Sequence, residues 1–392
     1  MTNTEIKLNL NNREIILIGT AHISQESITQ VTETIKTEQP NAVAIELDEQ
    51  RLATMKNPES WKNLDIVKVL KSGQSFVLMA NLILSSFQRR MGSDVGVKPG
   101  EEMKAAIDVA ESENIPTVMV DRPIQTTLKR AWAKNSLWGK CKLLAALLSS
   151  AFETEQISAE QIENMKNSNE MDAMMEELAD YLPKVKEVLI DERDEYLAAH
   201  IWKSQGDKVV AVLGAGHLPG VEKHLRALAN GTKSDDTSKI AEIPPASLAS
   251  KIAGWVFPIA IVGLLVAGFF TGGAVSSLQM LVQWLLWNGS LSALGTVLAG
   301  GNILAVVAGF FGAPIATLNP VIGVGLITGL VQAAVCKPKV SDMENLYSDV
   351  TSVKTFYKNR ILRVLLVFFL SSIGGLIGNL IAVPSLVTSL VK

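Results

Sequence analysis

The sequence predicts an α/β domain, with a mixed sheet flanked by helices, followed by a C-terminal α-helical transmembrane domain. Two observations support this fold class. Over roughly the first 230 residues, apolar segments typical of strands alternate with helical segments, which indicates a partly parallel sheet. From Ile252 to Cys336, and again from Val364 to Val391, no charged residue or histidine occurs, which is rare in a soluble domain.

The elements of the α/β domain are expected in alternating order. The run "REIILIG" predicts a buried strand within Leu8 to Ile18 that ends at Gly19. A helix follows, because Ile28, Val31 and Ile35 have helical spacing. Three more strands are expected in "NAVAIELD" (41–48), "NIPTVMVDR" (114–122) and "DKVVAVLGAGH" (207–217).

Composition divides the chain into a soluble domain (1–230), a linker (231–250) and a transmembrane domain (251–392). The linker is polar and ends near two prolines, as domain boundaries often do. Seven of the 36 Lys and Arg residues and three of the 39 Asp and Glu residues lie beyond residue 251, so the first part carries −7 and the second +4. An acidic soluble domain argues against nucleic acid as a partner.

The apolar part holds four or five candidate membrane helices, so a lipid bilayer is the expected environment. The helix at 277–287 is short for a span, and whether it crosses is left open. The expected helices are 255–270, 277–287, 291–311, 320–335 and 361–383. Asn302, Asn319 and Gln332 are expected to join helices rather than to form a transport path, which favours an anchor.

The orientation follows from the basic loop Lys337 to Arg363, which should lie in the cytoplasm. The N-terminus carries no pattern typical of a secretory signal, which favours a cytoplasmic soluble domain. We therefore expect an integral protein of a prokaryotic inner or plasma membrane.

Polar residues follow the predicted strands at the edge where open α/β sheets bind ligands. Two strands are each followed by a Gly-x-x-His motif, which places His22 and His217 at this edge. With 28 Gly and 4 His, chance gives about 0.3 such motifs, so the pair favours function. Two histidines and the carboxylate of Glu46 can form a three-ligand metal site with an open position. Glu46 could otherwise be a solvated strand end, and "DERDEYLAAH" (191–200) a solvated helix face.

Further segments match a known family in order along nearly the whole chain. In the soluble part these are "GTAHIS", "AIELDEQRL", "VKPGEEMKAAI", "DRPIQTTLKRAW", "ERDEYLAAHI" and "VVAVLGAGHLPGV". In the apolar part they are "NGSLSALGTVLAGG", "APIATLNPVIGVG" and "KPKVSDMENL". Together they resemble the TraB family, also called the pheromone-shutdown or PrgY family.

This resemblance implies an activity and roles for particular residues. TraB-like proteins are linked to shutting off a secreted peptide pheromone, and are grouped with Tiki-type proteases, GumN-like proteins, erythromycin-esterase-like hydrolases and haem-binding ChaN-like proteins. By similarity to Tiki-type members, His22 and His217 would be metal ligands, and Glu46 a third ligand or the base that activates water. Arg193 is similar to an arginine assigned to binding the substrate or the transition-state anion.

The resulting hypothesis is a membrane-anchored hydrolase that uses a divalent metal ion (Zn²⁺, Mn²⁺ or Co²⁺) to cleave a peptide or a small amide or ester. Arg51, Asp121, Arg122 and Arg130 are expected to bind the substrate. Two alternatives stay open: the same pocket sequesters a peptide or small ligand without turnover, or it handles haem or metal.

A homodimer is also expected. The segment Leu64 to Phe87 is apolar on more than one helical stripe, and a domain of this size has limited room to bury it. A two-fold contact, or contact with the bilayer, would cover this surface.

Overall fold

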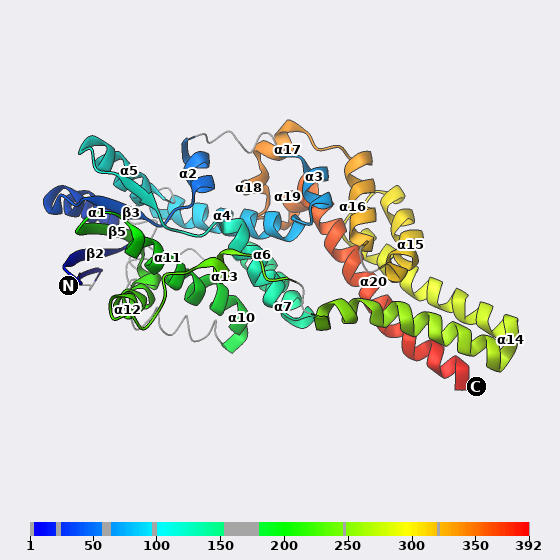
Figure 1. Ribbon diagram of the computed structural model, residues 1–392. Helices are drawn as coiled ribbons and strands as arrows, with labels where there is room; N and C mark the ends of the chain where they lie inside the picture. The colour runs from blue at the N-terminus through cyan, green and yellow to red at the C-terminus, as the bar shows by residue number, and fades with distance from the viewer. Residues whose placement is uncertain are drawn as a thin grey trace. The chain divides into compact units, whose positions relative to one another are not determined.

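A computed structural model describes residues 4–20, 25–56, 64–95, 100–152, 180–245, 248–319 and 322–391. These residues form two compact units (Figure 1). One unit, here called the α/β unit, comprises the described residues of 1–59 and 83–245. The other, the helical unit, comprises those of 60–82 and 246–392.

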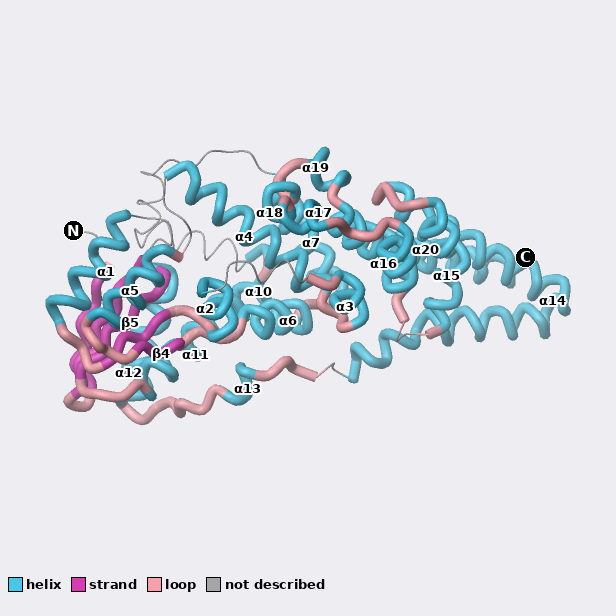
Figure 2. The backbone as a smooth tube through the Cα atoms, turned by 90° about the horizontal axis from the view of Figure 1, so that it is seen from above, coloured by secondary structure: helices cyan, strands magenta, loops and turns pink. Residues whose placement is uncertain are grey.

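The α/β unit contains a five-stranded mixed sheet in the order β1-β2-β5-β3-β4, drawn in magenta in Figure 2. The first strand is antiparallel to the second, and the other neighbours are parallel. The predicted α/β class with a mixed sheet is therefore confirmed. The strands are β1 (Glu5–Leu10), β2 (Arg13–Thr20), β3 (Ala42–Ile45), β4 (Thr117–Met119) and β5 (Lys208–Gly214).

The strand predicted from "REIILIG" is β2, but it begins at Arg13 and not at Leu8, because the chain reverses after β1, a strand that was not predicted. Asn11 and Asn12 have φ angles of 49° and 61°, and β1 pairs with β2 across them. Two successive residues at positive φ form the tight turn that suits the twist of a hairpin, and asparagine tolerates that conformation. The Asn-Asn pair was the signal for this turn.

Helices cover both faces of the sheet, so the α/β unit has three layers. Alternate residues of β2 point to opposite faces, as the strand period requires. Ile16 and Ile18 pack in one buried cluster with α1 (Gln25–Glu38) and α5 (Glu101–Ser112). Ile15 and Leu17 pack in the other with α11 (Glu192–Lys203) and α12 (Leu218–Ala229).

The other helices before residue 245 are short or lie outside the three layers, and among them α3 and the first residues of α4 belong to the helical unit. A π-helical turn, Glu187–Asp191, leads directly into α11. The others are α2 (Glu49–Lys56), α3 (Ile66–Lys71), α4 (Ser75–Val95), α6 (Ile124–Lys134), α7 (Leu137–Phe152), α10 (Pro183–Lys186) and α13 (Ser238–Ala241).

The helical unit begins with α14 (Leu248–Leu298), which turns back on itself (Figure 1). Gly273 has φ 74° and ψ −172°, a conformation that interrupts the helix and that glycine adopts most readily. Beyond it, the Ser277 hydroxyl donates a hydrogen bond to the Leu265 carbonyl at 3.0 Å. The segment 277–287, expected to be short, is thus part of a helical arm that continues to residue 298.

The expected helix at 291–311 is interrupted. Gly300 has φ 66°, and Asn302 caps the next helix by accepting a hydrogen bond from the Leu304 N–H. The helices that follow are α15 (Ile303–Leu318), α16 (Val324–Val335), α17 (Val340–Glu344), α18 (Leu346–Asp349), α19 (Val353–Lys358) and α20 (Arg360–Val391). In the described part of the chain two helices, spanning 254–298 and 360–390, are long and apolar enough to cross a membrane.

The long helices approach each other closely at glycines. A Cβ atom on Gly295 would lie 2.2 Å from the Leu370 carbonyl oxygen, and one on Gly374 would lie 2.2 Å from that of Leu291. Small residues at helix crossings let backbones come into contact, as in membrane helix pairs. Uncharged polar groups also join the helices, for example Asn288 Nδ2, which donates to Asn379 Oδ1 at 2.8 Å.

Residues 64–82 are part of the helical unit. Leu70 of α3 is 2% exposed and lies beside Gly329 of α16. Phe76 and Leu82 of α4 are also buried. Much of the apolar surface that suggested a homodimer is therefore covered within the chain, and the homodimer stays a prediction.

Candidate functional site

The candidate site lies at the carboxyl ends of the parallel strands. Glu46 follows β3, Asp121 lies just beyond β4, and His217 follows β5 on a short 3₁₀ turn. Because β5 lies between β2 and β3, residues distant in sequence meet at this edge. The first turn of α11 adds Arg193 and Asp194.

Glu46 is at the centre of this cluster and is 3% exposed. Its Oε2 accepts a hydrogen bond from the Gly214 N–H at 2.6 Å. Its Oε1 accepts one from Arg193 Nη2 at 2.5 Å. Glu46 is thus a buried and oriented carboxylate, and the interpretation as a solvated strand end is wrong.

Arg193 bridges two carboxylates. Its Nε and Nη2 donate to Asp121 Oδ1 and Oδ2 at 3.1 and 2.8 Å, in addition to the bond with Glu46. Burial opposes the charge of this guanidinium, but Asp121 and Glu46 outweigh it and raise its pKa. Among the described residues, nothing accepts a hydrogen bond from its Nη1, which keeps donor capacity for a ligand.

His217 is held from one side and faces Glu46 on the other. Its Nδ1 lies 2.6 Å from Asp194 Oδ1, and its Nε2 lies 3.6 Å from Glu46 Oε1. A carboxylate at Nδ1 favours the tautomer with the proton on that nitrogen, which leaves the Nε2 lone pair directed at the cluster. Burial raises the pKa of Asp194, although the hydrogen bond with His217 opposes this.

The glycines of this region provide space. A Cβ atom on Gly220 would lie 1.9 Å from Asp194 Oδ2, so this position must lack a side chain for Asp194 to reach His217. A Cβ atom on Gly19 would lie 2.5 Å from Leu218 Cδ1. The glycine of the first motif therefore permits close packing of the segment that carries His217.

The other motif histidine, His22, lies outside the described residues. Thr20, just before it at the end of β2, is 1% exposed, and its hydroxyl has no hydrogen-bond partner in the described part of the chain. Within the same described residues, no group of three or more His, Cys, Asp or Glu side chains is arranged to hold a metal ion.

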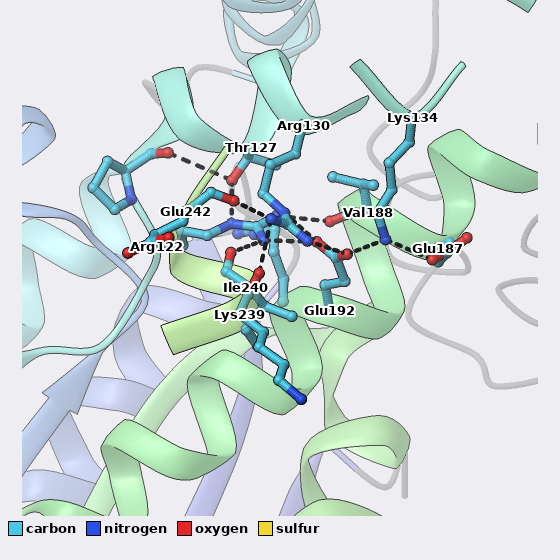
Figure 3. Close-up of polar contacts among 12 residues, drawn as sticks. Arg122, Thr127, Arg130, Lys134, Glu187, Val188, Glu192, Lys239, Ile240 and Glu242 are labelled. Carbon is cyan, nitrogen blue, oxygen red and sulfur yellow. Dashed lines mark hydrogen bonds and ion pairs between the residues drawn. The ribbon is translucent and has the colours of Figure 1, made fainter. Parts of the chain in front are cut away.

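Arg122 and Arg130 lie in a separate cluster around Glu192 (Figure 3). Arg122 Nη1 and Arg130 Nε each donate to Glu192 Oε2 at 2.8 Å, and Arg130 Nη2 donates to Oε1 at 2.7 Å. Lys134 adds an ion pair at 2.6 Å. Burial raises the pKa of Glu192, but these three cations outweigh burial and lower it to about 2.

The same two arginines also hold backbone carbonyls. Arg122 donates to the carbonyls of Ile240 and Val188 at 2.7 and 3.0 Å, and Arg130 donates to that of Lys239 at 3.0 Å. This cluster joins α6, the turn before α11 and α13. The structure thus engages the side chains of these arginines in internal contacts, while the Arg122 backbone N–H donates to Asp121 Oδ1 at 2.8 Å.

Arg51 is half-buried on α2, and its backbone N–H donates to Asp48 Oδ1 at 3.0 Å. The second oxygen of Asp48 accepts from the Ile124 N–H at 3.3 Å. Asp48 therefore caps two helices, which is the ordinary structural role of a carboxylate at a helix start.

Sequence reasoning missed Asp194, Gly220 and Glu192. A solvated helix face is the alternative given above for the run at 191–200, yet Glu192 and Asp194 are only 6% and 5% exposed. For Gly220 a signal was present, because the histidine of "GAGHLPG" is followed three residues later by a third glycine.

The molecule so defined is an α/β protein with a buried Glu–Arg–His cluster at the carboxyl edge of its sheet and long apolar helices after it. Comparison with models of protein families shows the family to which it belongs. Residues 6–232 match the model of the TraB/PrgY/gumN family, and residues 249–391 match the model described as TraB family protein, C-terminal domain. The chain belongs to the TraB/PrgY/gumN family.

Its relatives include archaeal and animal proteins. The uncharacterized protein MJ1365 of Methanocaldococcus jannaschii is 33% identical over 378 residues, which are 94% of each chain. A TraB domain-containing protein of Bos taurus is 30% identical over 68% of this chain and 75% of its own length. The human protein of that name is 29% identical over 64% of this chain and 71% of its own length.

Proposed function

We propose that the protein is a membrane-anchored, divalent-metal-dependent hydrolase that cleaves a peptide or a small amide or ester. The arrangement of Glu46, Arg193 and His217 supports this proposal most directly. A buried carboxylate, an arginine with a free Nη1 and an imidazole whose Nε2 lone pair faces the carboxylate would provide a base, an anion-binding group and a metal ligand.

The spacing of two donor atoms supports a divalent cation at this site. His217 Nε2 and Glu46 Oε1 are 3.6 Å apart, a separation at which both can ligate one ion at about 2.0 to 2.2 Å each. The contact of Nδ1 with Asp194 is the arrangement that metal-ligating histidines commonly show. We propose His22 as the third ligand, because its motif ends the neighbouring strand. A bound divalent cation supplies Lewis acidity and lowers the pKa of a water ligand.

Residues of the chain would provide the base, the group that binds the oxyanion and the group that orients it. Glu46, fixed by the Gly214 N–H, takes the proton of the attacking water if it is not itself a ligand of the ion. Arg193 directs its free Nη1 donors at the oxyanion that forms on the substrate. Asp121 holds the guanidinium through two hydrogen bonds, so its direction is set before the substrate arrives.

The decisive experiment compares full-length wild type with Glu46→Gln. The amide keeps the size of the side chain but cannot take a proton at neutral pH. If Glu46 is the base, hydrolysis of a peptide library should fall by about 10² or more while bound metal persists; if Glu46 is a ligand, metal is lost as well.

Glu111→Gln is the matched control, because Glu111 is an exposed residue of α5. It should leave both hydrolysis and bound metal unchanged. If wild type with metal bound cleaves no peptide or ester above the Glu46→Gln background, but still binds a ligand in a His22-dependent way, the protein is a sequestering receptor and the hydrolase proposal is wrong.

A further inference from the structure

Residues 337–363, which run from just after α16 into the first turn of α20, are here called the basic loop. It contains α17, α18 and α19, which lie together beside the first turns of α20 in both Figure 1 and Figure 2. It carries six basic residues against three acidic ones; the basic ones are Lys337, Lys339, Lys354, Lys358, Arg360 and Arg363.

The acidic residues of the basic loop are largely engaged within it. Asp342 Oδ2 accepts a hydrogen bond from the Lys339 backbone N–H at 2.7 Å, and Asp349 Oδ2 accepts one from Asn359 Nδ2 at 2.9 Å. The four lysines are exposed, and none forms an ion pair with a residue that the structure describes. The loop therefore presents an uncompensated positive charge.

Hydrogen bonds hold its two lysine-bearing ends together. Arg360 Nη1 donates to the Lys337 carbonyl at 2.7 Å. Asn359 Nδ2 donates to the Asp342 carbonyl at 2.6 Å. The pair Lys337 and Lys339 is thereby tied to the segment just after Lys354 and Lys358, so the four lysines belong to one surface.

This surface lies at one end of the apolar helices. Helix α16 ends at Val335, α20 begins at Arg360, and the Tyr357 hydroxyl donates to the Leu298 carbonyl, in the last residue of α14, at 2.9 Å. Val340 and Val353, each next to a lysine in sequence, are 63% and 55% exposed. Apolar side chains interleaved with lysines at helix ends are typical of the headgroup layer of a membrane.

We propose that the basic loop binds the headgroups of anionic phospholipids. The four lysines would contact lipid phosphates, while Val340 and Val353 enter the layer between headgroups and acyl chains. This surface belongs to the helical unit and the Glu46 cluster to the α/β unit, and lipid binding does not depend on hydrolysis. It does depend on the membrane placement that forms part of the proposed function.

The test reconstitutes the full-length protein in phosphatidylcholine vesicles and adds trace spin-labelled phosphatidylglycerol or phosphatidylcholine. Electron paramagnetic resonance then gives the fraction of each lipid that the protein immobilises. We expect wild type to prefer the anionic lipid by on the order of fivefold or more, and the variant with Lys337, Lys339, Lys354 and Lys358 all changed to Gln to show almost no preference.

A control variant with the same charge change has Gln in place of four exposed lysines of the α/β unit, Lys36, Lys104, Lys184 and Lys223. Its preference for the anionic lipid should match that of wild type. Raising NaCl from 0.1 to 1 M should reduce the preference of wild type without any substitution, because the Debye length falls from about 10 to 3 Å.

Two results would overturn the proposal, and they are distinguishable. Immobilised lipid without any anionic preference would refute the lipid site and leave the membrane placement intact. If the protein does not insert into the vesicles and immobilises no lipid, both the lipid site and the membrane placement are refuted.

Discussion

At the scale of single residues, the site depends on groups that orient other groups. Asp194 fixes the imidazole of His217, and Asp121 fixes the guanidinium of Arg193. Asp194 can reach His217 only because α11 and α12 approach closely at Gly220, where a Cβ atom would lie 1.9 Å from Asp194 Oδ2. Substitution of a residue that fixes the tautomer of a metal-ligating histidine commonly lowers the affinity for the metal by about 10- to 100-fold. A substitution of Asp194 is therefore a sensitive test of the metal hypothesis.

We predict that Asp194→Ala weakens binding of a divalent cation by the full-length protein by about 10- to 100-fold. Gly220→Ala should have an effect in the same direction, because its Cβ would occupy the place of Asp194 Oδ2. Isothermal titration calorimetry measures both. Asp108→Ala, at an exposed position of α5, is the control. Equal affinity in all four proteins would contradict the role assigned to Asp194.

Glu192 gives a prediction about pH. Its pKa in the folded protein is about 2, below the ordinary value of 4.5. A lowered pKa stabilises the fold above pH 4.5, by about 3 kcal/mol at most, and this contribution is lost as the pH falls from about 5 towards 2.

Glu192→Gln should therefore lower stability at pH 7, by about 3 kcal/mol or more because three cations lose their partner. Its stability should also change less than that of wild type between pH 5 and 3. Thermal unfolding in detergent at several pH values measures both effects, with Glu111→Gln as the control. A variant that loses stability in parallel with wild type as the pH falls would contradict the assignment.

At the scale of elements, glycine decides how closely the apolar helices pack. Gly295 of α14 faces the Leu370 carbonyl of α20, whereas Gly263 of the same helix has nothing within 4 Å of the position where a Cβ would lie. The same substitution changes helix propensity by a similar amount at both positions. A difference in stability between the two variants therefore reports the packing of the helices.

We predict that Gly295→Val destabilises the helical unit by about 2 kcal/mol or more, because the side chain must displace backbone atoms of α20. Gly263→Val should change stability by less than about 0.5 kcal/mol. Retention of a monodisperse peak in size-exclusion chromatography after stepwise heating compares the two. Equal heat resistance would mean that the helices do not pack through Gly295.

At the scale of the whole molecule, the proposed cytoplasmic placement of the α/β unit can be tested directly. We predict that a cysteine at the exposed position Asp236, in a variant whose Cys141 and Cys336 are replaced, is protected from an impermeant maleimide in intact cells. Lysis should expose it. Labelling of intact cells would reverse the assigned orientation, and would make an extracellular peptide substrate accessible.

Patterns in the sequence were enough to predict the α/β class, four of the five strands, the long apolar helices and the family. They also placed Glu46 and His217 at strand ends. These features follow from patterns among neighbouring residues, such as alternation, helical spacing and the Gly-x-x-His motif, which a linear chain displays directly. Even the missed hairpin was marked locally, by Asn11 and Asn12.

Which charged groups meet depends on how the elements pack in three dimensions. Arg193 and Glu46 are 147 positions apart, and they pair because β5 inserts between β2 and β3 and brings α11 over the ends of the strands. Arg122 and Arg130 were expected at a substrate but contact Glu192, 70 and 62 positions away. A buried charge takes the partner that the packing of elements supplies, because leaving it unpaired costs several kcal/mol, and that packing is not written in any local pattern.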